Sequence, residues 1–185
     1  PAMSYLQELT TSLNQLGWGV YQTDHEDANG QYEINFDFTD ALTTADRVTF
    51  FKMATSQIAK KYGAIATHMA KPFADQTGSG LHVHFHLADV NTGDGVFEDH
   101  SDARGLGCSE IAYHFLGGVL QHARALCAVT SPTVNCYKRL KLGTGLTSNR
   151  SGFTWTPAFV SYGDNNRTQM IRTAGPGHFE DRTVS

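Results

Sequence analysis

A short segment near the middle of the chain, residues 78–87, joins a Gly-Ser-Gly turn to a run in which apolar residues and histidines alternate. Such alternation predicts a β-strand, because successive side chains of a strand point to opposite faces. The histidines would then lie on one face, about 7 Å apart per pair, with the apolar residues on the core. The two sets are His82, His84 and His86, and Leu81, Val83, Phe85 and Leu87.

Three imidazoles behind a glycine turn indicate a metal or phosphate site. Imidazole is the commonest neutral metal ligand, and glycine lets a backbone pass close to a phosphate or an ion. The alternative interpretation is an exposed histidine face on a half-buried sheet. The pattern by itself names neither a metal nor a reaction.

The composition is that of one compact soluble domain. With 185 residues, of which 40% are hydrophobic, the chain can bury a substantial core. Charged residues make up only 17% and the formal net charge is -4, so the basic field of a nucleic-acid-binding protein is lacking. Cys108, Cys127 and Cys136 have no C-x-x-C spacing and are expected to be free thiols in a reducing cytoplasm. Without a signal peptide or an apolar run of about 18 residues, we expect no membrane partner.

Periodicity predicts three helices and several strands. The helices are one with Leu6, Leu9, Leu13 and Leu16 on one side that ends at Gly17, one capped by Thr43 or Thr44 that ends at Gly63, and one over residues 109–129. The strands are 18–21, 31–38, 64–69 and 81–87, with further short strands between 154 and 182. Because the two kinds of element do not alternate regularly, the expected fold class is α+β with a mainly antiparallel sheet and flanking helices.

Acidic residues suggest which metal would bind. Glu26 and Glu33 lie on either side of the turn signal at 29–30, and Glu180 lies close to Arg182. Carboxylates with an imidazole suit Mg²⁺ or Mn²⁺, whereas a structural zinc site would usually bring cysteines. Each acid taken alone is typical of a solvated surface group, and only assembly near His82 would make a site.

Positive charge is concentrated in the later part of the chain. No acid occurs between Glu110 and Asp164, and that span holds Arg124, Lys138, Arg139, Lys141 and Arg150. Arginine can bind phosphates or carboxylates bidentately, so this arm and the later Arg167 and Arg172 can neutralise anions. A solvated basic face is the alternative. Acids that hold cations beside arginines that hold anions are the arrangement that phosphoryl transfer needs, although no Walker A motif is present.

Six motifs, in one order along nearly the whole chain, resemble those of the glutamine synthetase family. They are Gly30-Gln31-Tyr32-Glu33, Lys71-Pro72-Phe73, Gly78-Ser79-Gly80-Leu81-His82-Val83-His84, Ser131-Pro132-Thr133 through Tyr137-Lys138-Arg139-Leu140, Asn166-Arg167-Thr168 to Ile171-Arg172, and Phe179-Glu180-Asp181-Arg182. Residues 147–155 and 165–172 resemble most the branch of type III-like enzymes and glutamate–methylamine ligases.

The resemblance implies a catalytic domain with a curved antiparallel sheet, in a ring-shaped homo-oligomer that binds ATP and divalent cations between subunits. It implies metal ligands at Glu26 and Glu33 for one ion and at His82 and Glu180 for another. It places His84 near the nucleotide phosphates, Gly78 and the guanidinium groups of Arg139 and Arg182 at the glutamate substrate, and Arg167 and Arg172 at the transferring phosphoryl group or the nucleotide. The implied reaction phosphorylates the side-chain carboxylate of glutamate, and an amine then displaces phosphate to form an amide.

Two departures from the family pattern bear on the substrate. Residues 141–153 contain no acid where the family carries a glutamate that helps to deprotonate ammonium, so methylamine or another primary amine is a candidate acceptor. His178 stands where many members carry an arginine near the nucleotide. The resemblance also implies that residues 1–185 are part of a catalytic domain that continues at both ends, and that this part alone turns over poorly.

Two other functions fit some of these features. A domain that keeps the fold and binds nucleotide without turnover, in a regulatory or assembly role, is favoured by the missing acid. A hydrolase would use His82, His84 and His86 around one zinc ion and would need no ATP.

Overall fold

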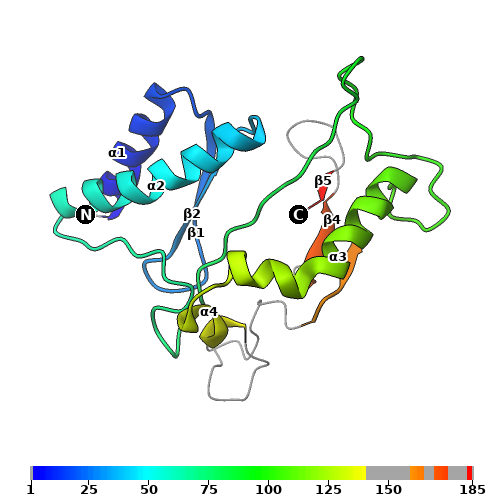
Figure 1. Cartoon of the computed structure of the whole chain (residues 1–185). Coiled ribbons are helices and arrows are strands. Elements are labelled where there is room, and N and C mark those ends of the chain that lie inside the picture. Colours follow the sequence, from blue (N-terminus) through cyan, green and yellow to red (C-terminus); the bar gives the residue numbers. More distant parts are fainter. Residues whose placement is uncertain (1, 141–158, 165–168, 175–182, 185) are drawn as a thin grey trace. The chain divides into compact units, whose positions relative to one another are not determined.

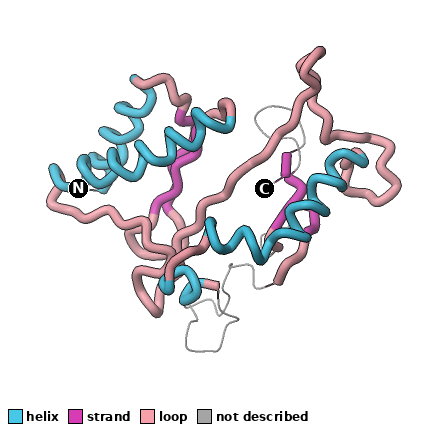
Figure 2. Tube along the Cα trace, viewed as in Figure 1, coloured by secondary structure: helices cyan, strands magenta, loops and turns pink. Residues whose placement is uncertain are grey.

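The computed structural model describes residues 2–140, 159–164, 169–174 and 183–184. The chain divides into two compact units, Pro1–Ser79 and Gly80–Ser185, and each is described by itself. Figures 1 and 2 show the elements of both units. A single domain over residues 1–185 stays a prediction.

The first unit packs two helices against a β-hairpin. Its elements are α1 (Ala2–Gln15), β1 (Val20–His25), β2 (Tyr32–Phe36) and α2 (Ala41–Lys61). Helix α1 contacts both α2 and β1, as Figure 1 shows. The buried centre consists of Leu9, Leu13, Trp18 and Ile58, against which Ile34 and Phe36 of the hairpin also pack. Burial of these side chains is the main force that holds the helices on the hairpin.

Helix α1 confirms the leucine periodicity with one exception. Leu6, Leu9 and Leu13 are buried, but Leu16 lies beyond the end of the helix and is 56% exposed. Gly17 adopts φ +76°, a left-handed conformation that favours glycine and ends the helix.

Helix α2 ends where predicted but begins earlier, and a different residue caps it. The side chain of Asp40 accepts hydrogen bonds from the backbone N–H groups of Leu42 and Thr43, at 3.1 and 3.0 Å. A cap at Thr43 or Thr44 was therefore the wrong prediction, since the helix begins earlier and a carboxylate satisfies two of its free N–H groups. The predicted stop at Gly63 is confirmed, with φ +67°.

The β1–β2 hairpin is antiparallel and pairs Asp24 with Glu33 and Thr23 with Ile34. The first strand extends beyond the predicted segment 18–21. Its residues after Tyr21 alternate poorly in hydropathy, so the sequence pattern did not indicate them, and pairing with β2 holds them in the strand. Gly30 in the turn has φ +73°, as the turn signal at 29–30 leads one to expect.

Residues 64–69 form no strand and are held against α2 by His68. The His68 Nε2 and Thr55 Oγ1 atoms lie 2.9 Å apart, and the imidazole meets the ring of Phe51 edge-on. The predicted strand here was wrong, because neighbouring residues offer it no hydrogen-bonding edge and Ile65 is 94% exposed.

Acid is expected to destabilise the first unit through His68. Burial, helped by the positive charge of Lys52, holds the pKa of His68 below its ordinary value. The unfolded chain then binds a proton at His68 more readily than the folded chain does. The contribution of His68 to the stability of the first unit is therefore fully present above the unfolded pKa of about 6.5. It is lost as the pH falls through that value towards and below the folded pKa.

Urea unfolding at about pH 7.5 and about pH 5.5, on either side of the ordinary histidine pKa, measures this effect. The matched variant is His68→Gln, which keeps a donor for Thr55 but does not titrate. The unmodified protein should lose more stability than the variant between the two pH values, and an equal loss in both would contradict the assignment to His68.

The second unit is built around α3 (Glu110–Thr130), which Ser109 caps by accepting from the Ala112 N–H at 3.2 Å. The predicted helix over 109–129 is thereby confirmed. Ala112 and Leu116 lie on the buried side of this helix. They belong to one core cluster with Phe97, Cys108 and Ile171. The remaining elements are α4 (Val134–Arg139), β3 (Tyr162–Asp164), β4 (Ile171–Ala174) and β5 (Thr183–Val184).

The loop that precedes α3 is organised by one carboxylate, that of Asp102. It accepts the Tyr113 hydroxyl at 2.6 Å and the backbone N–H groups of Arg104, Leu106 and Cys108 at 2.9 to 3.1 Å. Hydrogen bonds to the ionised form hold the pKa of Asp102 well below its usual range, with the bond from Tyr113 first among them. The loop is thus a closed structure fixed to α3.

The predicted strand over 81–87 is wrong. In the described residues this part of the chain is extended and takes part in isolated bridges only, such as Ala88 with Gly95. Its apolar side chains, which were expected in the core, are 40% to 65% exposed: Leu81, Val83, Phe85 and Leu87. Alternation gives a segment two faces, but a strand also needs a neighbour to complete its hydrogen bonds.

The described residues form two small sheets and no single curved antiparallel sheet. The first is the β1–β2 hairpin, and the second has the order β3-β4-β5, in which β3 and β4 run parallel. The α+β mixture is confirmed, but the curved sheet is not seen in these ranges. Within them, none of the helices combines the length and the apolar character needed to cross a bilayer.

Candidate functional site

Glu26 and Glu33 are brought together by the hairpin. Glu26 directly follows β1, where its N–H donates to the Gln31 carbonyl at 2.9 Å, and Glu33 lies two residues further along in β2. A hydrogen bond that the protonated Glu26 carboxyl donates to the Glu33 carboxylate raises the pKa of Glu26, and partial burial adds to the effect. Two carboxylates this close disfavour each other's ionised form, which a divalent cation would relieve. The pair therefore has the donor chemistry that Mg²⁺ or Mn²⁺ requires.

The predicted substrate residue Gly78 lies beside the same hairpin. Its carbonyl accepts a hydrogen bond from the Gln31 side-chain amide at 3.0 Å. The hydroxyl of Thr77 donates to the Asp27 carboxylate, so two consecutive loop residues are attached to the hairpin turn. The first unit thus connects a carboxylate pair and a glycine loop by hydrogen bonds across the hairpin turn.

Arg139 occupies the last turn of α4 in the second unit. Burial lowers the pKa of its guanidinium group, an effect that the nearby Cys136 opposes. Its Nε atom is buried and has no hydrogen-bond partner within the part of the chain that the structure describes. A desolvated guanidinium with an unused donor favours binding of a carboxylate or phosphate.

Gly80 allows this arrangement because its backbone lies against Arg139. A Cβ atom on Gly80 would lie 3.0 Å from Arg139 Nη2 and 3.8 Å from His82 Nε2. Any larger residue would therefore push the guanidinium group, which makes the glycine a steric requirement of the site rather than a turn requirement.

The other predicted site residues are only partly described. His82 and His84 are exposed, and Arg172 is half-buried in β4 opposite Gly163. Glu180, Arg167 and Arg182 lie outside the described residues, as do His178 and the segment 141–153. Glu26, Glu33 and Gly78 belong to the first unit, and His82, His84, Arg139 and Arg172 to the second. The convergence of all of them on one site stays a prediction.

The three histidines of the central segment do not form a metal centre. Among the described residues, no group of three or more histidine, cysteine or acidic side chains is placed to hold a metal ion. The hydrolase interpretation loses its site, because residues 81–87 form no regular strand that would align His82, His84 and His86.

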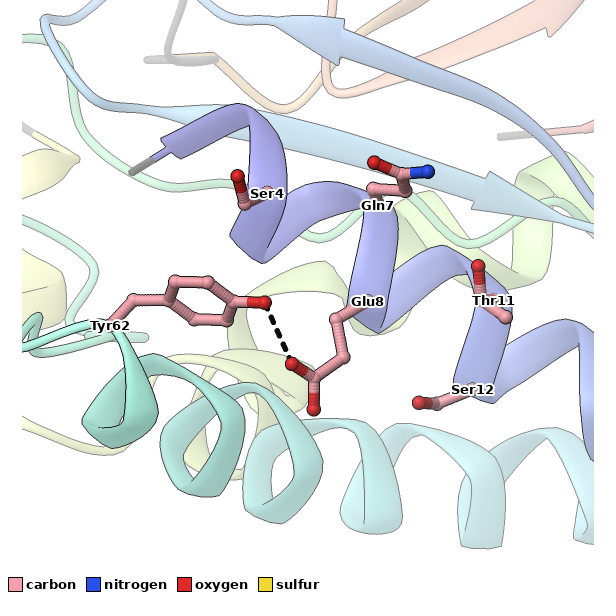
Figure 3. A pocket seen from close by; sticks show the side chains of 6 residues that line it. All are labelled: Ser4, Gln7, Glu8, Thr11, Ser12 and Tyr62. Carbon is pink, nitrogen blue, oxygen red and sulfur yellow. Dashed lines mark hydrogen bonds between the residues drawn. The ribbon is translucent and has the colours of Figure 1, made fainter.

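A surface pocket that the sequence did not predict lies between α1 and the end of α2 (Figure 3). It is lined by Ser4, Gln7, Glu8, Thr11, Ser12 and Tyr62. The Glu8 carboxylate accepts from the Tyr62 hydroxyl at 2.7 Å and from Lys61, and these bonds lower its pKa. Since Glu8 is already engaged and no predicted site residue contributes, the pocket is separate from the candidate site.

Sequence reasoning gave no role to Gln31, although the residue stands in one of the quoted motifs. The two bonds of its side-chain amide, to Ala28 and to Gly78, explain its place in the structure. The sequence indicates a role for Gln31 only through its position between the turn and Glu33. It does not indicate the partner, because Gly78 is 47 residues away.

Comparison with known protein sequences gives one consistent result. The family model described as glutamine synthetase, catalytic domain, matches residues 1–183. Glutamate–methylamine ligase of Methyloversatilis universalis is 51% identical over 174 residues, which are 94% of this chain and 38% of that protein. Glutamine synthetase of Rhizobium meliloti is 47% identical over 177 residues, which are 96% of this chain and 39% of that protein. The chain thus spans about two fifths of the length of these relatives.

Solved structures agree with the sequence relatives. A GmaS/ADP complex matches with a TM-score of 0.80 and 47% identity, covering 98% of this chain and 39% of its own. The cryo-EM structure of Plasmodium falciparum glutamine synthetase matches with a TM-score of 0.82 and 28% identity, covering 97% of this chain and 33% of its own. These matches assign the chain to the fold of the glutamine synthetase catalytic domain.

Proposed function

Because the chain belongs to the glutamine synthetase family, we propose that it forms part of an ATP-dependent ligase that joins the side-chain carboxylate of glutamate to ammonia or a primary amine. The observation that carries the proposal is the Glu26–Glu33 carboxylate pair, with the Gly78 loop hydrogen-bonded to the same hairpin. The hairpin and the loop bonded to it thereby offer groups for a cation and for a substrate.

Glu26 and Glu33 hold one divalent cation, Mg²⁺ or Mn²⁺, and His82 with Glu180 holds a second. The raised pKa of Glu26 supports the first of these, since the two carboxylates repel each other until positive charge is placed beside them. When bound, the cations offset the repulsion between the glutamate carboxylate and the triphosphate of ATP. Carboxylate and imidazole ligands without cysteine fit magnesium or manganese better than zinc.

The arginines bind the anionic groups of the substrates. Arg139, with its buried and unused Nε donor, and Arg182 hold the carboxylates of glutamate, while Gly78 contacts the substrate through its loop. His84, Arg167 and Arg172 contact the phosphates of ATP. The solved ADP complex of a relative supports nucleotide binding by the complete protein.

In the proposed reaction an oxygen of the glutamate side chain attacks the terminal phosphorus of ATP. The new O–P bond forms as the bond to the ADP oxygen breaks, and Arg167 and Arg172 neutralise the charge on the transferring group. The amine nitrogen then attacks the acyl carbon, a C–N bond forms, phosphate leaves with the C–O electron pair, and the nitrogen releases a proton. The arginines and the glycine loop contribute by orienting the reactants.

Methylamine or another primary amine is the proposed acceptor. The absence of any acid in residues 141–153 supports this choice, because it departs from the pattern of family members that use a glutamate there to deprotonate ammonium. The name of the 51% identical relative, glutamate–methylamine ligase, supports it as well. We further propose a cytoplasmic, ring-shaped homo-oligomer whose subunits contain a curved antiparallel sheet.

Phosphate release by the full-length protein to which residues 1–185 belong, with ATP, Mg²⁺, glutamate and a panel of amines, tests the proposal. We expect release that requires glutamate and is faster with methylamine than with ammonia. Faster release with ammonia would overturn the choice of amine only. ATP binding without phosphate release, for every amine, would favour the non-catalytic alternative, which the missing acid in 141–153 also supports.

A further inference from the structure

Both the backbone and the side chain of Gln31 form hydrogen bonds in the first unit. Its backbone N–H donates to the Ala28 carbonyl at 3.0 Å, and its own carbonyl accepts from the Glu26 N–H at 2.9 Å. The side-chain oxygen accepts from the Ala28 N–H at 3.0 Å, which fixes the orientation of the amide. The amide nitrogen is left pointing to the Gly78 carbonyl, which accepts from it at 3.0 Å.

The loop that Gln31 reaches is closed upon itself. The Ser79 N–H donates to the Ala70 carbonyl at 3.0 Å, and the buried Lys71 ammonium donates to the Gln76 carbonyl. These bonds make residues 70–79 a single loop that moves as a unit. Its attachments to the hairpin among the described contacts are Gln31 to Gly78 and Thr77 to Asp27.

The hairpin end of this connection belongs to the carboxylate pair. Glu26 donates its N–H to Gln31, and Glu33 follows Gln31 by two residues on β2. A shift of the turn that altered Glu26 would therefore move the Gln31 side chain, and with it the Gly78 carbonyl. Glutamine suits this role because it offers an acceptor and a donor on one planar group.

We propose that Gln31 is a positioning residue, which sets the place of the Gly78 loop relative to the Glu26–Glu33 pair and thereby the affinity for glutamate. The inference rests on the proposed ligase function. The Glu26–Glu33 pair does not bind glutamate, and Gln31 does not touch it. Gln31 acts on the substrate through Gly78.

The Gln31→Glu variant isolates the connection. It keeps an acceptor for the Ala28 N–H and removes the donor to Gly78. Gln22→Glu is the matched control, because Gln22 lies exposed on β1 and this substitution adds the same charge to the same hairpin. Thr77→Val removes the second attachment without adding charge.

We expect Gln31→Glu to raise the KM for glutamate by about tenfold, as for loss of one hydrogen bond that fixes a binding group, and to change kcat less than KM. Mn²⁺ affinity, measured by electron paramagnetic resonance, should be at least that of the unmodified protein. Thr77→Val should change KM in the same direction, and Gln22→Glu should leave it unchanged. Amide hydrogen exchange in residues 74–80 should accelerate in the first two variants only.

Equal KM values for Gln31→Glu and Gln22→Glu would overturn the inference while leaving the ligase intact. A fall in Mn²⁺ affinity that matches the rise in KM would also overturn it, since Gln31 would then act through the carboxylates. Failure of the unmodified protein to release phosphate with any amine overturns the proposed function instead, and the positioning role with it.

Discussion

The Glu33→Gln variant is expected to lose about a hundredfold to a thousandfold in kcat, the range in which removal of a group that stabilises developing charge falls. The variant keeps the size and hydrogen bonding of the side chain, so the hairpin should persist. It removes one of the two charges that would bind a cation, and the loss should appear in both phosphate release and Mn²⁺ binding.

Asp24→Asn is the matched control, since Asp24 pairs directly with Glu33 across the hairpin. It removes one negative charge from the same strands without altering the Glu26–Glu33 contact. If Asp24→Asn weakened Mn²⁺ binding as much as Glu33→Gln, the effect would come from the general charge of the hairpin. The assignment of Glu33 as a ligand would then be wrong.

Replacement of Arg139 by lysine is expected to raise the KM for glutamate by about a hundredfold. Lysine keeps the charge but cannot present two parallel N–H groups to a carboxylate, and it lacks the Nε donor that is buried in the structure. Gly80→Val should produce a similar rise, because its side chain would occupy the space beside Arg139 Nη2.

The neighbouring Lys138, exposed on the same helix, provides the control for Arg139. Lys138→Met removes a positive charge from α4 and should leave the KM for glutamate within about twofold, as is usual for an exposed charge. A KM for Arg139→Lys that equalled that of the unmodified protein would show that this guanidinium does not bind the substrate.

The helices of this chain could be predicted because their signals are local. Leucines at helical spacing located α1, and Ser109 with the following apolar run located α3. The cap of α2 was missed because Asp40, Thr43 and Thr44 all lie near its start and only the backbone geometry chooses Asp40. Helix α4 has six residues, too few for a periodic pattern.

Strands and long-range contacts were harder to predict. The hairpin followed from its turn signal, and with it came the meeting of Glu26 and Glu33. Residues 81–87 have the alternation of a strand but no regular partner among the described residues, and alternation contains no information about a partner. The contact of Gln31 with Gly78 spans 47 residues, so no local pattern could reveal it.

The carboxylate of Asp102 responds to acid at a lower pH than His68, so the two halves of the chain lose stability in different pH ranges. Its pKa is depressed in the folded loop, so the bonds it accepts persist until the medium becomes acidic enough to protonate an ordinary aspartate, near about pH 3.9 and below. The His68 contact in the first unit weakens much earlier. Mild acidification should therefore loosen one half while the other keeps its native shape, and denaturation by acid should proceed in two stages rather than as a single cooperative event.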